Sequence, residues 1–288
     1  MKLSHITLCV LLAITAKSYA IEATTPASCR QQLYQLTEYG SPDKTKAPEP
    51  LMLLVWNVQK FADPSALAWL EERSAQIIMT QESIASIQRD FAENLNATDT
   101  FSPGYRTFDN ETSGVGIVTT LETLMSCAWQ HEEPWLLTPK ATLVSALRTA
   151  NQILLAVNLH AINFSLGTQE LQEQLDAISK VIDQYTGPIV VAGDFNTWSK
   201  ARTEILQRFI QRHELTATNF DPDYRVRPFS YPLDHILTKN LEVLTAQSEH
   251  SELSDHTPLM MTIRTSQAAS PELAFRRPTE IERPLPKR

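Results

Sequence analysis

The stretch Val190-Val191-Ala192-Gly193-Asp194-Phe195-Asn196 decides how this chain is interpreted, because an apolar run ends there in two polar side chains. Residues 189–192 predict a short buried strand, which a glycine closes. Residues two apart in an extended chain point the same way, so Asp194 and Asn196 can be aimed at one point. A carboxylate beside a carboxamide suits a metal-bound water or a phosphate oxygen, whereas an ordinary Asp/Asn turn is the alternative. The other strand ends of the chain separate these two interpretations.

Short apolar strands alternate with amphipathic helices between residues 51 and 265. We expect strands at residues 51–56, 76–80, 115–119, 141–148, 152–159, 189–192, 233–237 and 259–263, with a hairpin turn at 149–151. Helices are expected at residues 168–185, capped by Thr168, and at residues 199–213. Helices combined with hairpin strands predict α/β layers with mixed sheets.

The predicted strands share one feature, which is a polar side chain at an end of an apolar run. Such groups are costly to bury unless they satisfy one another or a metal. They are Asn57, Glu82, His160, the pair Asp194 and Asn196, Asp234, and the pair Asp255 and His256. Six strand ends of this kind predict a site along one edge of a sheet.

The motifs that hold these residues resemble a known family. WNVQ at residues 56–59, QES at 81–83, NLHA at 158–161, GDFN at 193–196, LDHI at 233–236 and SDH at 254–256 resemble, in order, the endonuclease/exonuclease/phosphatase superfamily. That superfamily includes deoxyribonuclease I, abasic endonucleases, sphingomyelinases and inositol polyphosphate phosphatases, and the phrases around these motifs look closest to bacterial YafD-like proteins. The resemblance implies a four-layered α/β sandwich in which two packed mixed β-sheets are flanked by helices.

Three residues are expected to hold a divalent cation. A hard cation bound by oxygen ligands offsets the charge of a phosphodiester and stabilises the leaving oxygen. Glu82 is our first choice as Mg²⁺ ligand, and the resemblance implies that Asn57 and Asp255 complete the shell directly or through water; Mn²⁺ or Ca²⁺ are alternatives. From the residues alone, Glu82 also fits an exposed glutamate that opens a helix, and the other two fit turns.

The catalytic residues follow from the same motifs. Asp194 would orient or deprotonate the attacking water, and Asn196 would hold the phosphate or the water in line. His256 would bond a phosphoryl oxygen or handle a proton, and its partner Asp234 would fix the tautomer and raise the basicity of the ring. The resemblance assigns His160 to the phosphate.

Two further residues complete the expected site. Lys140 lies where relatives carry a cation that faces the scissile phosphate, although a solvated lysine at a strand end is the alternative. The carboxylate partner of His160 is not evident, and Glu111 is our suggestion for it.

The ends of the chain differ from the middle. Residues 1–20 predict a cleavable signal peptide, cut after Ala20, and hence a periplasmic or secreted protein. Residues 21–50 predict an N-terminal arm with a proline-rich linker, residues 51–265 one domain, and residues 266–288 a flexible tail. No run after residue 20 approaches the roughly 20 apolar residues of a membrane span. In an oxidising compartment Cys29 and Cys127 can pair, and two buried thiols are the alternative.

The predicted function is a Mg²⁺-dependent phosphoester hydrolase, with a monomeric nuclease as the first interpretation. The alternatives are a phosphodiesterase or phosphatase that acts on a phospholipid or a small phosphodiester, and a non-catalytic binding subunit. Loss of residues 1–20 moves the formal net charge from −8 to −10, which is unusual for a nucleic-acid binder. A nuclease needs cations around its site, for which Lys140, Arg225 and Arg227 are candidates, whereas a lipid enzyme needs exposed apolar loops.

Overall fold

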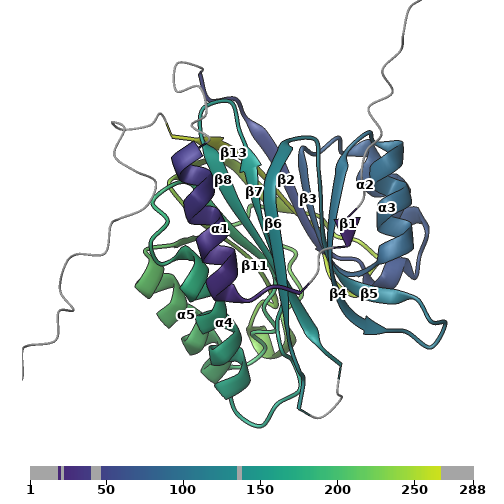
Figure 1. Ribbon diagram of the computed structural model, residues 1–288. Helices are drawn as coiled ribbons and strands as arrows, with labels where there is room; N and C mark the ends of the chain where they lie inside the picture. The colour runs from purple at the N-terminus through teal and green to yellow at the C-terminus, as the bar shows by residue number, and fades with distance from the viewer. Residues whose placement is uncertain (1–18, 21–22, 40–46, 135–137, 267–288) are drawn as a thin grey trace, which may run out of the picture.

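Two mixed β-sheets pack face to face in the computed structural model, which describes residues 19–20, 23–39, 47–134 and 138–266 (Figure 1). The first sheet has the order β1 (Tyr19–Ala20), β4 (Thr98–Arg106), β5 (Thr112–Thr119), β3 (Ile77–Ile84), β2 (Leu51–Asn57), β13 (Leu259–Thr265) and β12 (Leu241–Ser248). The second has the order β10 (Thr216–Ala217), β11 (Asp234–Lys239), β9 (Ile189–Asp194), β8 (Ile153–His160), β7 (Lys140–Arg148) and β6 (Glu122–His131).

Helices cover the outer faces and complete four layers. Figure 1 shows α2 (Ser65–Glu72) and α3 (Ala85–Asn94) beside the first sheet, and α1 (Pro26–Tyr39), α4 (Gln169–Ile182) and α5 (Lys200–His213) beside the second. Two short 3₁₀ turns, η1 (Gln59–Phe61) and η2 (Pro228–Ser230), lie in connections. This arrangement is the predicted four-layered α/β sandwich, so the predicted fold class is confirmed.

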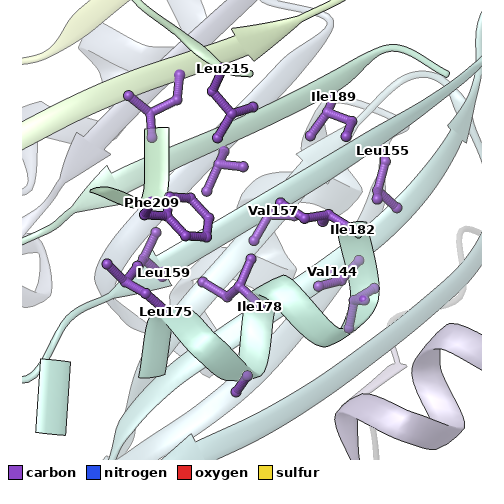
Figure 2. Close-up of a cluster of buried hydrophobic side chains, with 14 of the residues drawn as sticks. Val144, Leu155, Val157, Leu159, Leu175, Ile178, Ile182, Ile189, Phe209 and Leu215 are labelled. Carbon is purple, nitrogen blue, oxygen red and sulfur yellow. The ribbon is translucent and has the colours of Figure 1, made fainter. Parts of the chain in front are cut away.

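Three apolar cores separate the layers. The middle core joins the sheets and includes Met79, Leu143 and Ile236. In the outer core beneath α4, Leu175 and Ile178 face strand β8 (Figure 2). Because both faces of each sheet are covered, the central strands read as continuous apolar runs rather than alternating ones.

The elements differ from the predicted ones mainly at their ends. Strand β3 continues to Ile84 and β9 to Asp194, so Glu82 and Asp194 belong to the strands themselves, whereas Asn196 lies just beyond β9. Thr168 occupies the N-cap position of α4, but its side chain makes no capping hydrogen bond. Ser199 does cap α5, because its Oγ accepts from the backbone N–H of Arg202 at 3.4 Å.

The N-terminal segment adds a helix to the second sheet. Helix α1 packs against α4, and Cys29 in α1 is bonded to Cys127 in β6, with the two Cα atoms 5.8 Å apart. The two cysteines therefore pair. Most of the predicted signal peptide, the centre of the linker and the predicted tail lie outside the described residues. Within the described ranges, no helix is long and apolar enough to cross a membrane.

Candidate active site

Strand register brings the predicted site residues to one edge of the sheet pair. Parallel strands β2 and β3 set Asn57 opposite Gln81. In the second sheet, parallel strands β8 and β9 set His160 opposite Asp194, and antiparallel β11 sets Asp234 on the other side of Asp194. Three predicted catalytic residues thus lie in a row across three neighbouring strands.

Gly193 allows these strands to approach closely. Its φ is +136°, which L side chains rarely adopt, and a Cβ built on it would lie 2.1 Å from the carbonyl oxygen of Leu159. Only glycine fits between β8 and β9 here, directly before the central carboxylate of the site.

The Asp194 carboxylate is the centre of the cluster. It is 2% exposed, and it accepts hydrogen bonds from the backbone N–H of Asn196 at 2.9 Å and from Nδ2 of Asn57 at 3.3 Å. Its Oδ2 also lies 3.5 Å from Nε2 of His160 and 3.8 Å from Nε2 of His256. Burial raises the pKa of Asp194 above its usual range in spite of these histidines. A carboxylate with a raised pKa is a stronger base, which suits removal of a proton from water.

Asn196 supports this carboxylate. Its φ is +50°, and its Nδ2 donates to the carbonyl of Ala161 at 3.0 Å and to Oδ2 of Asp194 at 3.2 Å. The amide protons are therefore directed at the protein, and the side chain positions Asp194. The contact with phosphate expected from the sequence stays a prediction.

His256 and Asp234 form the predicted pair. Nδ1 of His256 lies 2.8 Å from Oδ2 of Asp234, and both side chains are buried. The backbone carbonyl of His256 accepts from Nε1 of Trp56 at 2.9 Å, which fixes the residue just before β13. Burial opposes a charged ring, but the carboxylates of Asp234 and Asp194 raise the pKa of His256 to about 10. The ring is thus an imidazolium at neutral pH.

His160 is in the opposite state. Burial and the ammonium of Lys140 lower the pKa of His160 to about 4, so its ring is neutral at neutral pH. Nζ of Lys140 lies 2.9 Å from Nε2 of His160, and both residues are buried. The suggestion of Glu111 as its partner is wrong, because Glu111 is exposed and bonds Ser86 instead. Within the described chain, the carboxylates of Asp194 and Glu82 lie within 4 Å of Nε2 of His160, because both strands end beside it.

Glu82 lies at the end of β3 next to these groups. Burial opposes its ionisation, but His160 and the ammonium groups of Lys60 and Lys140 lower the pKa of Glu82 to about 2. Its Oε2 contacts Nζ of Lys60, and its Oε1 lies 3.9 Å from Nε2 of His160. Glu82 also has a left-handed backbone, with φ +50°. A half-buried carboxylate that stays ionised and touches a cation is a suitable ligand for a metal ion.

Asn57 and Asp255, the other two predicted metal ligands, lie beside the same strand end. The backbone carbonyl of Asn57 accepts from Oγ of Ser254 at 2.7 Å, and the backbone N–H of Asp255 donates to Oε1 of Gln59 at 3.3 Å. Asp255 is exposed, whereas Asn57 is buried and its Nδ2 is used by Asp194. No direct contact joins Asp255 to Glu82 in the described residues. The three residues therefore do not form a closed coordination shell.

The donor set fits a hard divalent cation. Glu82, Asn57 and Asp255 offer only oxygen ligands, and the Lys60 ammonium against Glu82 shows that the position accepts positive charge. A second candidate group is buried. The ligand atoms of Asp194, Asp234 and His256 lie within 4.8 Å of one another, but Nδ1 of the histidine already bonds Asp234.

An amide pair below the site was not predicted to have a role. Nε2 of Gln81 donates to Oδ1 of Asn158 at 2.7 Å, and Nδ2 of Asn158 donates to the backbone carbonyls of Thr80 at 3.0 Å and Gly116 at 2.8 Å. Asn158 belongs to the second sheet and its partners to the first. This inter-sheet clamp fixes the strand end that carries Glu82. Asn158 and Gln81 lie within the motifs NLHA and QES, and this position is the only feature of the sequence that could have indicated their role.

Comparison with known proteins identifies the family. The profile described as Endonuclease/Exonuclease/phosphatase family matches residues 54–256. This chain belongs to that family. The UPF0294 protein of Vibrio cholerae serotype O1 is 36% identical over 219 residues, which cover 74% of this chain and 78% of the relative.

The family's solved structures share the fold. An endonuclease/exonuclease/phosphatase from Beutenbergia cavernae superposes with a TM-score of 0.64 at 13% identity and covers 75% of this chain and 72% of its own. ANGEL2, a 2′,3′-cyclic phosphatase, superposes with a TM-score of 0.58 at 17% identity. The superposition covers 75% of this chain and 95% of ANGEL2. This chain therefore has the phosphoesterase fold of the family, and the predicted resemblance is confirmed.

Proposed function

We propose that this chain is a Mg²⁺-dependent phosphodiesterase in which Asp194 activates a water molecule for in-line attack on phosphorus. The observation that carries the proposal is the position of Asp194, which lies between a neutral and a charged histidine and has a raised pKa. Paired titratable groups with opposite shifts are the usual arrangement of acid and base catalysts.

Each side chain then has one task. Asp194 takes the proton of the attacking water as the new P–O bond forms, and Asn196 and Asn57 hold that carboxylate in place. As the bond from phosphorus to the leaving oxygen breaks, the His256 imidazolium donates a hydrogen bond or a proton to an oxygen of the reacting group. Asp234 keeps the ring oriented and charged. Lys140, beside neutral His160, supplies positive charge for the phosphate.

Glu82, with Asn57 and Asp255 beside it, would hold the cation. A bound Mg²⁺ supplies charge stabilisation for the phosphoryl and leaving oxygens. Glu82→Gln should therefore raise the Mg²⁺ concentration needed for half-maximal activity by at least about tenfold, since it removes the one ligand that carries a full, half-buried charge. Glu111→Gln is the matched control.

The decisive assay is hydrolysis of bis(p-nitrophenyl) phosphate by the purified full chain. We expect release of p-nitrophenolate that needs Mg²⁺ and falls by about 10²–10⁴-fold in Asp194→Asn, the range for loss of a general base. Glu111→Gln, at the same edge but without contact to either histidine, should retain activity. A folded protein that hydrolyses no phosphodiester, with or without Mg²⁺, would leave the binding-subunit alternative.

The nuclease prediction is tested with supercoiled plasmid in the same buffer. Nicking that disappears with chelator and in His256→Ala would support it, and intact plasmid beside active hydrolysis of the small diester would oppose it.

The disulfide between Cys29 and Cys127 supports the expected periplasmic or secreted location, because such bonds persist in oxidising compartments. N-terminal sequencing of the exported protein should read from Ile21 onward.

A further inference from the structure

Large apolar side chains are exposed around the active site. Among the described residues, seven large hydrophobic side chains are exposed, and five of them belong to loops at the active-site edge. All five are more than half exposed, and the four without a polar atom in the side chain, Phe108, Phe164, Leu166 and Phe229, stand on three separate loops. We call these four side chains the apolar rim. The other exposed ones are Tyr224, next to η2, and Tyr34 and Val243, which lie elsewhere.

The first loop is the hairpin between β4 and β5, which projects from the sheet in Figure 1. Phe108 stands at its tip and is fully exposed. The base of the hairpin adjoins the site, because Tyr105 lines a small hollow together with Glu82 and His160. Glu111 ties the hairpin to the start of α3 through Oγ of Ser86 at 3.1 Å.

The second loop follows His160 directly and carries Phe164 and Leu166. It is held from beneath, because Oε1 of buried Glu133 accepts from the backbone N–H groups of Asn163 and Phe164, both at 2.7 Å. Residues 161–168 contain no charged side chain, and Leu166 is 80% exposed. A supported loop thus presents two apolar side chains beside the catalytic histidine.

The third loop leads into Asp234 and carries Phe229 in η2. Phe229 is 81% exposed and has a φ of +52°, a left-handed conformation that is unfavourable for a bulky residue. The loop is closed behind it, where the backbone N–H of Leu233 donates to the carbonyl of Val226 at 3.2 Å. Phe229 therefore stays exposed at a backbone position that is unfavourable for a bulky residue.

Most of the cations in the described part of this edge already contact a polar partner. Lys60 contacts Glu82, Lys140 bonds His160, and both Arg225 and Arg227 bond Asp223. Nucleic-acid binding depends on cations that are free to neutralise phosphates, and the chain as a whole carries a formal net charge of −8. Apolar side chains with few free cations beside them instead match a surface that is polar but carries no net charge.

We propose that the apolar rim docks the active-site edge on a zwitterionic phospholipid bilayer, so that the phosphodiester presented to Asp194 is that of a lipid head group. The rim sits on separated loops rather than in one continuous patch, which suits insertion between lipid head groups more than burial against a protein. The proposal of docking is supported by the apolar rim alone. The choice of substrate rests on the phosphodiesterase function proposed above.

The test measures flotation of the full chain with phosphatidylcholine vesicles, separately from catalysis. Changing all four rim side chains to serine should weaken vesicle binding at least about tenfold, while Val243→Ser, an exposed apolar position at the far end of β12, should not. Each protein is purified in its exported form, expected to begin at Ile21, so that the apolar run of residues 1–20 does not itself bind the vesicles. The double variant Phe108→Ser/Phe229→Ser changes only the two most exposed aromatic tips and should show an intermediate loss.

Hydrolysis of soluble bis(p-nitrophenyl) phosphate separates the two proposals. The serine variants should keep this activity and lose hydrolysis of vesicle phosphatidylcholine. Equal vesicle binding by the wild type and the fourfold variant, or no binding by either, overturns the docking while the small-diester activity stands. Rim variants that lose binding to single-stranded DNA rather than to vesicles also overturn it, in favour of base stacking. Vesicle binding without hydrolysis of any diester overturns the phosphodiesterase instead.

Discussion

Asp234→Asn should move the pH dependence of catalysis. Oδ2 of Asp234 lies 2.8 Å from Nδ1 of His256, and this carboxylate is the strongest influence that favours the charged ring. Asparagine has the same shape and can still accept a hydrogen bond from Nδ1, but it carries no charge. The substitution therefore tests electrostatics with little change in packing.

The size of the effect follows from the pKa of His256, which is raised from 6.5 to about 10. At pH 8 the wild-type ring is about 99% protonated, whereas a ring with an ordinary pKa is about 3% protonated. Because the pKa is raised in the folded enzyme, the imidazolium persists as pH rises until about pH 10. In the variant it should be lost from about pH 6.5 upward. The variant should therefore lose up to about 30-fold more activity at pH 8 than at pH 5.5, since Asp194 still supports the charge.

The assay is kcat/KM for bis(p-nitrophenyl) phosphate between pH 5 and 10 at saturating Mg²⁺. An NMR titration of the His256 ring in both proteins gives the pKa directly. Glu111→Gln, which removes an exposed negative charge from the same edge, should leave both curves unchanged. Parallel pH profiles for the wild type and Asp234→Asn, or a His256 pKa that does not move, would refute the reasoning.

Three further outcomes are expected. Asn158→Leu leaves three buried hydrogen-bonding groups without their partner, so urea unfolding should show a loss of about 3 kcal/mol or more; an unchanged midpoint would contradict the clamp. Replacing Cys29 and Cys127 by serine opens a cross-link with a sequence separation of 98. The chain-entropy argument gives a loss of about 4–5 kcal/mol for such a loop, and the reduced wild type should match the variant in the same measurement. Lys140→Gln should raise the pKa of His160 from about 4, which ring NMR would report, because it removes the ammonium 2.9 Å away.

Much of the second sheet could be predicted from the sequence. Strands β7, β8 and β9 are continuous apolar runs, and the turn between β7 and β8 carries an evident hairpin signal. Other strands were missed because their sequences are mixed. Strand β6 is half-buried over much of its length, and β12 alternates between exposed and partly buried positions. Helix α1 has weak amphipathic character and is held by tertiary contacts and the disulfide.

The site was predictable as residue types but not as contacts. Motif order indicated Asp194, His256 and Asp234, and the strand register brings them together. Local sequence does not show which long side chain from another element reaches a given group. Lys60 reaches Glu82 from η1, and Lys140 reaches His160 from β7. For the same reason Glu111 was mistaken for the partner of His160.

Strand β13 has a consequence for how the protein is made. It lies between β2 and β12 and pairs with both, although it is the last strand among the described residues. During synthesis, the first sheet therefore waits for residues 259–265 before the position between β2 and β12 is filled. The segment that ends just before β13 also carries His256. A chain released before residue 254 lacks both the strand that joins β12 to the sheet and the histidine of the candidate site, so we expect such a product to have no activity.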